Sequence, residues 1–229
     1  MGIYNRYVLP RLINRTMQNT RAAAERTRFV PCASGKVLEV GIGSGLNIPF
    51  YSPDLDTLVG LDPSVALWKL GRQRMAAAPF PIAYIGGSGE HIPLEDKMFD
   101  TVVTTWTLCT IPNPVTALKE MRRVLKPDGR LIFVEHGLAP DRRVQVWQNR
   151  LNPLWHRLAG GCNLQRRIDT LIADAGFRIC QIEMGYLQGP KPFSFLYKGL
   201  ARPIDTTAGQ YPTGHRSTQE QVPSLSSRR

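Results

Sequence analysis

Residues 36–45 read KVLEVGIGSG, a short apolar run followed by glycines at positions 41, 43 and 45. A short β-branched and apolar run that ends in glycine predicts a buried strand over residues 36–41. The glycines that follow allow a sharp turn and let a ligand approach bare backbone amides at a helix start. A second strand is predicted over residues 57–62, TLVGLD, so the turn joins two strands of one sheet.

Strands and helices continue to alternate after this unit. Residues 64–78 have helical composition, and Asn113 and Pro114 predict the cap and first turn of a helix that runs to Lys126. Three further strands are predicted, at 81–87, 99–106 and 129–136. This order implies a mostly parallel sheet with helices on both faces.

The last third of the chain closes the sheet differently. Residues 144–158 and 163–175 are predicted helices, and residues 177–184 and 193–201 alternate as a closing pair of strands. The prediction is therefore an α/β, Rossmann-like, mostly parallel seven-stranded sheet over a domain at residues 31–204.

The two ends of the chain differ from this domain. Residues 1–30 predict an N-terminal helical segment, interrupted at Pro10, with apolar positions such as Tyr4, Val8 and Leu12 between arginines. We interpret it as a lid over an acceptor site, with contact to an anionic bilayer as the alternative. Residues 205–229 are polar and rich in Pro, Ser and Gly, which predicts a disordered tail.

Composition excludes several classes of protein. Apolar residues make up 42% of the 229, and no run approaches the roughly 18 apolar residues of a membrane-spanning helix. No secretory signal is recognisable at the start, so a cytoplasmic protein is expected. The cysteines are scattered without a CxxC pair, which predicts neither a zinc site nor a disulfide framework. They are Cys32, Cys109, Cys162 and Cys180.

The positive charge is concentrated in two segments. Residues 1–30 carry six arginines against one acid, and residues 142–167 carry six arginines and no acid, which together account for the net charge of +11. Such segments suit an anionic partner, a lipid surface or a nucleic acid, or are simply solvated helix faces.

The glycine-rich turn indicates what the domain binds. A dinucleotide fingerprint is GxGxxG, whereas this chain has ExGxGxG, with Leu46 where the third glycine would stand. The carboxylate of Glu39 suits a cationic ligand and conflicts with a pyrophosphate. S-adenosylmethionine has an amino group and a sulfonium and no phosphate, so it is the predicted cofactor. Asp62, at the end of the second strand, can accept hydrogen bonds from both ribose hydroxyls.

At these positions the chain resembles the class I S-adenosylmethionine-dependent methyltransferases of the type 11 kind. The resemblance covers roughly residues 30–185, in VLEVGIGSG, GLDPS, GSGEHIPLEDKMFDTVV and ALKEMRRVLKPDGRLIFVEH. It implies that one set of residues surrounds the cofactor and that Thr105 and Trp106 border the transferring methyl group. That set is Glu39, Gly41, Gly43, Gly45, Asp62, Pro63, Ser88, Gly89 and Glu90. Ser88 stands where many relatives have an acid facing the adenine.

A narrower resemblance concerns the acceptor. FDTVVTTWTLCTI, FVEHGLAP, VWQNRLNPLWH and GGCNLQR are similar to the methyltransferase-like 7 group and its bacterial relatives. That group comprises membrane-associated methyltransferases of small alkyl thiols, and its bacterial members are often labelled phospholipid methyltransferases. The resemblance implies a small-molecule acceptor such as a thiol, with a phosphatidylethanolamine-type amine as the alternative.

His136, after the fifth strand, is the candidate catalytic base, against the alternative of a structural histidine. No metal is expected. Other functions weighed were an NAD(P)-dependent oxidoreductase, a non-catalytic membrane- or nucleic-acid-binding module and an RNA methyltransferase. The first conflicts with Glu39, the second with the intact cofactor motif, and the third lacks an NPPY-type motif. No nucleic-acid partner is therefore expected.

Overall fold

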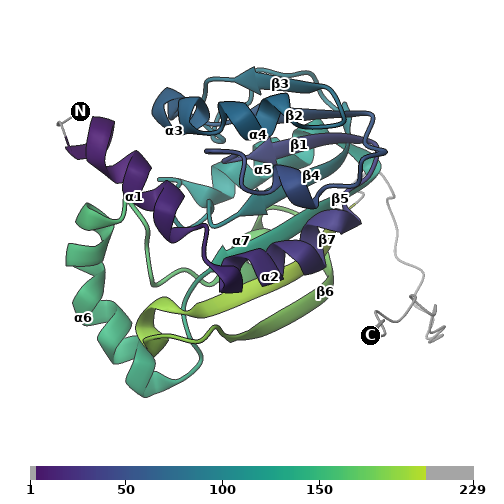
Figure 1. The fold of residues 1–229 in the computed structure, drawn as a ribbon. Helices are drawn as coiled ribbons and strands as arrows, with labels where there is room; N and C mark the ends of the chain where they lie inside the picture. The colour runs from purple at the N-terminus through teal and green to yellow at the C-terminus, as the bar shows by residue number, and fades with distance from the viewer. Residues whose placement is uncertain (1–3, 205–229) are drawn as a thin grey trace, which may run out of the picture.

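A computed structural model describes residues 4–204, apart from the side chains of residues 5 and 6. Seven strands form one sheet in the order β3-β2-β1-β4-β5-β7-β6 (Figure 1). Their bounds are β1 (Lys36–Val40), β2 (Thr57–Leu61), β3 (Ile82–Ile85), β4 (Phe99–Thr105), β5 (Leu125–His136), β6 (Phe177–Tyr186) and β7 (Phe195–Pro203).

The first five strands are parallel, and the last two are antiparallel to their neighbours. This arrangement confirms the predicted Rossmann-like α/β fold. The chain order reverses between β1 and β4, so the carboxyl ends of these strands frame the crevice where open α/β sheets bind ligands.

Helices cover both faces of the sheet (Figure 1). On one face, Leu118, Met121 and Ile172 pack into one buried core cluster. On the other, Phe29 and Ile48 belong to a second cluster. The helices are α1 (Leu9–Thr16), α2 (Thr20–Phe29), α3 (Val65–Leu70), α4 (Arg72–Ala76), α5 (Pro114–Val124), α6 (Arg142–Leu158) and α7 (Ile168–Asp174). Short helical turns are η1 (Tyr4–Val8, a π-helix) and the 3-10 turns η2 (Val30–Cys32), η3 (Ile48–Phe50) and η4 (Lys191–Phe193).

The bounds of several predicted helices differ in the structure. The segment 64–78 divides into α3 and α4 at Gly71, where an added Cβ would lie 2.4 Å from the backbone oxygen of Ser44. Residues 163–167 are not helical, because the side chain of Asn163 accepts the backbone N–H of Gln165 and makes a turn there. Helix α5 ends at Val124, two residues before the predicted Lys126, and the chain continues as β5.

The N-terminal segment divides into two parts with different surroundings. Helix α1 begins at Leu9, directly after the π-helical turn η1, with Pro10 in its first turn. Helix α2 packs on the sheet, with Phe29 buried and Glu25 accepting two hydrogen bonds of 3.0 Å from Lys198 on β7. The predicted disordered tail, residues 205–229, lies outside the described residues.

Candidate functional site

The glycine-rich turn after β1 adopts backbone conformations that favour glycine. Gly41, Gly43 and Gly45 have φ values of +82°, +52° and +69°. A Cβ on Gly41 would lie 2.1 Å from the hydroxyl of Thr107, so no other residue fits there. The space beside Gly43 is open, with no atom closer than 3.7 Å to such a Cβ. The turn therefore presents bare backbone to a cavity.

This cavity has a volume of about 660 Å³ and lies at the carboxyl ends of β1, β2 and β4. Nine of the predicted site residues line it, whereas Gly45, Glu90 and His136 do not. The nine are Glu39, Gly41, Gly43, Asp62, Pro63, Ser88, Gly89, Thr105 and Trp106. Gly45 instead packs on Ile48, 2.6 Å from an added Cβ.

Asp62 is held in place by the two loops that flank it. Its Oδ2 accepts the backbone N–H of Gly43 at 2.9 Å and its Oδ1 accepts that of Ser64 at 2.7 Å. Burial raises the pKa of Asp62, and these two hydrogen bonds oppose the shift. Each carboxylate oxygen keeps a second lone pair, so two more donors can be accepted. That is the requirement for gripping the two hydroxyls of a ribose.

Glu39 is buried at the floor of the cavity between two donors. Asn47 Nδ2 donates to its Oε1 at 2.9 Å, and the hydroxyl of Tyr51 donates to its Oε2 at 2.8 Å. Burial raises the pKa of Glu39 to about 8, against the opposing effects of Tyr51, Arg26 and Asn47. A cationic group in the cavity would favour the ionised form, which is the property expected for a residue that receives an ammonium group.

Arg26 of α2 is a cavity residue that the sequence interpretation missed. Its Nε donates to Asn47 Oδ1 at 2.9 Å, its Nη1 donates to the backbone oxygen of Met17 at 2.9 Å, and its guanidinium lies 4.9 Å from the centre of the Trp106 ring. Burial lowers its pKa to about 10, so it remains a cation at neutral pH. A cation and a carboxylate on one wall suit a ligand that carries both an amino and a carboxylate group.

Ser88 and Glu90, on the loop after β3, are hydrogen-bonded to each other. The hydroxyl of Ser88 donates to Glu90 at 3.1 Å, and the carboxylate of Glu90 also accepts the backbone N–H of Asn113 at 2.7 Å. Glu90 thus holds the start of α5, and Ser88 rather than Glu90 faces the cavity.

The loop after β4 is shaped by a buried carboxylate that was not predicted. Glu135 accepts the backbone N–H of Thr107 at 2.9 Å and the hydroxyl of Thr104 at 2.8 Å. Burial raises its pKa to about 7, and these hydrogen bonds oppose that effect. Trp106 takes a φ of +50° at this bend and lines the cavity.

The remaining wall comes from α1 and from the end of α6. These residues are Leu9, Pro10, Ile13, Met17, His156, Arg157, Gly160 and Gly161. Because Asp62 and Glu39 occupy the β1–β2 side, this wall and Trp106 border the rest of the cavity. Only a three-dimensional arrangement brings His156 here, more than a hundred residues from the glycine-rich turn.

His136 lies behind the cavity instead of in its wall. Its side chain is only 5% exposed, and its Nδ1 is 3.8 Å from the Sγ of Cys162. Its Nε2 has no hydrogen-bond partner within the described part of the chain. The catalytic role predicted for His136 therefore stays a prediction.

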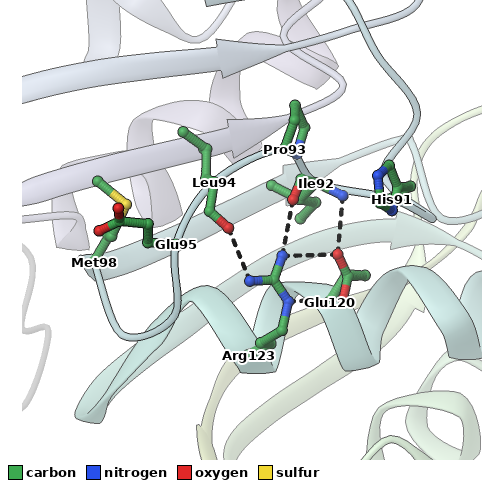
Figure 2. A pocket seen from close by; sticks show the side chains of 8 residues that line it. All are labelled: His91, Ile92, Pro93, Leu94, Glu95, Met98, Glu120 and Arg123. Atoms are coloured by element: carbon green, nitrogen blue, oxygen red, sulfur yellow. Dashed lines mark hydrogen bonds and ion pairs between the residues drawn. The ribbon is translucent and has the colours of Figure 1, made fainter.

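The residues of a second hollow, shown in Figure 2, have a structural role, because they connect a loop to a helix. It lies between the loop 91–98 and α5, and Arg123 fills its centre. That guanidinium donates to both oxygens of Glu120 and to the backbone oxygens of Ile92 and Leu94, at 2.8–2.9 Å. With its donors used in this way, Arg123 ties the loop to α5.

Residues 4–204 contain neither a candidate metal site nor a candidate membrane-spanning helix. In that range no three His, Cys, Asp or Glu side chains are grouped so as to hold a metal ion. None of the described helices is both long and apolar enough to cross a bilayer.

Comparison with known proteins identifies the class. Residues 38–133 match the family of methyltransferase domains. The fold resembles an S-adenosylmethionine-dependent methyltransferase from Thermotoga maritima, with a TM-score of 0.58 over 87% of this chain and 99% of that one at 19% identity. The chain is an S-adenosylmethionine-dependent methyltransferase of class I.

The relatives define the family more narrowly. The chain is 33% identical over 193 residues to human thiol S-methyltransferase TMT1B, covering 81% of this chain and 77% of that protein. It is 35% identical over 171 residues to the rat TMT1B, covering 71% of this chain and 66% of the rat protein. The chain belongs to the family that contains these thiol S-methyltransferases.

Proposed function

We propose that this methyltransferase transfers the methyl group of S-adenosylmethionine to a small thiol. The observation that carries the proposal is the wall opposite Glu39 and Asp62, which combines apolar side chains with the cationic or protonatable side chains Arg157 and His156. An apolar wall suits an alkyl chain, and a neighbouring cation favours the thiolate form of its sulfur. The relatives named thiol S-methyltransferases support the same acceptor.

The residues of the cavity fit the cofactor group by group. Asp62 would accept the ribose hydroxyls, Glu39 would receive the amino group, and Arg26 would pair with the carboxylate. Pro63, Ser88 and Gly89 would border the adenine. When bound, the cofactor supplies an electrophilic methyl group on a sulfonium.

The protein's part in such a displacement is positioning and charge control. Trp106 and Thr105, beside the Glu135-anchored loop, would fix the line of approach of the nucleophile. His156 would take up the proton of the thiol and release it to solvent, since it is exposed at the mouth of the cavity. His136 would act only indirectly, through Cys162.

The N-terminal segment is proposed to act as a lid. Helix α1 supplies Leu9, Pro10 and Ile13 to the cavity wall. The hydroxyl of Tyr4, just before α1, donates to the backbone oxygen of Leu158 at the end of α6 at 2.8 Å. Opening this contact would admit the acceptor.

A phospholipid amine is the second candidate acceptor. Large apolar side chains are exposed on the segments that border the cavity mouth, which suits an amphiphilic substrate or peripheral contact with an anionic membrane. They are Tyr7, Val8, Leu12, Val146, Trp147, Leu154 and Leu158.

The test is a set of initial-rate measurements with purified protein and methyl-labelled cofactor. The acceptors are a short alkyl thiol, the amine of the same carbon skeleton and vesicles containing phosphatidylethanolamine. The proposal predicts a labelled thioether from the thiol and little product from the others. Methylated lipid in the absence of thioether would establish the second candidate instead. The His156→Gln variant should lose thiol turnover while retaining cofactor affinity, with Lys69→Gln on α3 as a surface control.

A further inference from the structure

Two cysteines face each other immediately behind the cavity wall. Cys109 lies in the loop after β4 and Cys162 in the loop after α6, and the backbone N–H of Asn163 donates to the oxygen of Cys109 at 2.8 Å. The neighbours of these cysteines, Thr110 and Gly161, both line the cavity. A change in the bonding of the two sulfurs would therefore move residues that line the proposed acceptor end of the cavity.

The two thiols are free and lie close enough for each to shift the pKa of the other. Cys109 is only 2% exposed, whereas Cys162 is partly accessible. Cys162 is therefore the more exposed residue of the two.

The groups around Cys162 favour a negative charge on its sulfur. His136 Nδ1 lies 3.8 Å away, and the indole of Trp155 faces the same atom. The indole N–H is buried and has no nitrogen or oxygen partner among residues 4–204. A thiolate at Cys162 would give that donor an acceptor.

The same contacts divide the pair into a nucleophile and a partner. The hydrogen bond from Cys109 and then His136 lower the pKa of Cys162, although burial opposes them. The hydrogen bond with Cys162 and burial raise the pKa of Cys109. A low-pKa accessible sulfur beside a protonated buried one is the arrangement of a reactive and a resolving cysteine.

We propose that Cys109 and Cys162 form a thiol–disulfide exchange site that reacts with low-molecular-weight disulfides and reversibly shuts off methyl transfer. The Cys162 thiolate attacks one sulfur of R–S–S–R, which forms a mixed disulfide and releases R–S⁻. The sulfur of Cys109 then attacks the Cys162 sulfur of that mixed disulfide. The second R–S⁻ leaves and takes the Cys109 proton, so one small disulfide is reduced to two thiols as the cysteines are oxidised.

The geometry explains why the bridge would stop turnover. A sulfur–sulfur bond is about 2.05 Å long, so the bridge would pull the two sulfurs, and the loops that carry them, toward each other. An added Cβ on Gly161 would already lie 3.3 Å from the backbone oxygen of Thr110. Further approach narrows the cavity between these two residues. The proposal holds for any acceptor, because it concerns the shape of the wall.

The test uses the full chain with Cys32→Ser and Cys180→Ser, which removes the other two cysteines. The reduced protein is treated with 2-hydroxyethyl disulfide and analysed by intact mass and peptide mapping. We expect loss of two hydrogen atoms and a Cys109–Cys162 cross-link. Adding Cys109→Ser should stop the reaction at a mixed disulfide on Cys162, and adding Cys162→Ser instead should leave Cys109 unmodified. A stable mixed disulfide without a cross-link, or faster reaction at Cys109, would overturn the proposal.

Two further measurements distinguish a reactive cysteine pair from one that only packs in the structure. Alkylation of Cys162 by iodoacetamide should persist at a pH where a free cysteine is slow, and His136→Gln should move that profile to higher pH. Methyl transfer should be lost in the cross-linked protein and return after reduction with a phosphine. Unchanged turnover in the fully cross-linked protein would refute the shut-off, and an unshifted His136→Gln profile would refute the role of the imidazole.

Discussion

Asp62→Asn tests whether the carboxylate of Asp62, at the end of β2, accepts hydrogen bonds from the ribose hydroxyls of the cofactor. Each carboxylate oxygen already accepts one backbone N–H, from Gly43 or Ser64, and keeps one lone pair for the ligand. In the variant an NH₂ group replaces one oxygen. It must face one of those backbone donors, and it can no longer accept from a ribose hydroxyl.

The expected loss of cofactor affinity follows from the loss of one hydrogen-bond acceptor. One charge-assisted hydrogen bond contributes about 1.5–3 kcal/mol. At about 1.4 kcal/mol for each tenfold change, the dissociation constant for S-adenosylmethionine should rise roughly 10- to 150-fold. Titration calorimetry with the cofactor and its demethylated product measures this directly.

Asp128→Asn is the matched control, because it is the same substitution at an exposed position outside the cavity. It should bind like the wild type. The melting temperature should be measured for both variants, so that lost affinity is separated from lost folding. A folded Asp62→Asn protein with unchanged affinity would refute the assignment of Asp62 to the ribose.

Three other results are expected. Because burial raises the pKa of Glu39 to about 8, this carboxyl group ionises at lower pH in the unfolded chain than in the folded protein. The free energy of unfolding of the wild type should therefore fall as pH rises from about 4.5 to 8, by up to about 1.4 kcal/mol per pH unit. Glu39→Gln should flatten that part of the plot of melting temperature against pH, and an equally steep plot would contradict the assignment. Deleting residues 1–16 leaves Asn19 to cap α2, so the truncated protein should keep most of its cofactor affinity in calorimetry but turn over the acceptor more slowly. Full turnover of a soluble thiol, with loss only of liposome binding, would instead favour the bilayer interpretation. A chain that ends at Ile204 should keep its melting temperature and cofactor affinity, and a clear drop in either would show that residues 205–229 stabilise the domain.

The parts of the site that could be predicted are those built by strand ends and the turns after them. The run KVLEVGIGSG and the acid at Asp62 place their groups at one sheet edge, because parallel strands bring their carboxyl ends together. Within these segments, the position of a residue in the motif did not determine whether that residue faces the cavity. Gly45 and Glu90 lie in the expected loops, yet Gly45 packs on Ile48 and Glu90 holds Asn113.

The parts that could not be predicted come from helices distant in the sequence. Arg26 and His156 reach the cavity only because α2 packs on the sheet and α6 ends beside α1. No local spacing encodes such contacts. The close approach of Gly71 to the backbone of Ser44 in the glycine-rich turn also joins segments that are distant in the sequence.

A single competition reaction shows whether the protein methylates a thiol in preference to an amine. Purified protein receives cofactor with a deuterium-labelled methyl group, together with equal concentrations of a short alkyl thiol and the amine of the same skeleton. Mass spectrometry then measures both products, with Asp62→Asn as the control for enzymatic transfer. We expect labelled thioether in excess, formed one for one with the demethylated cofactor and strongly reduced in the variant. Labelled amine in excess, or thioether formed equally by the variant, would contradict it.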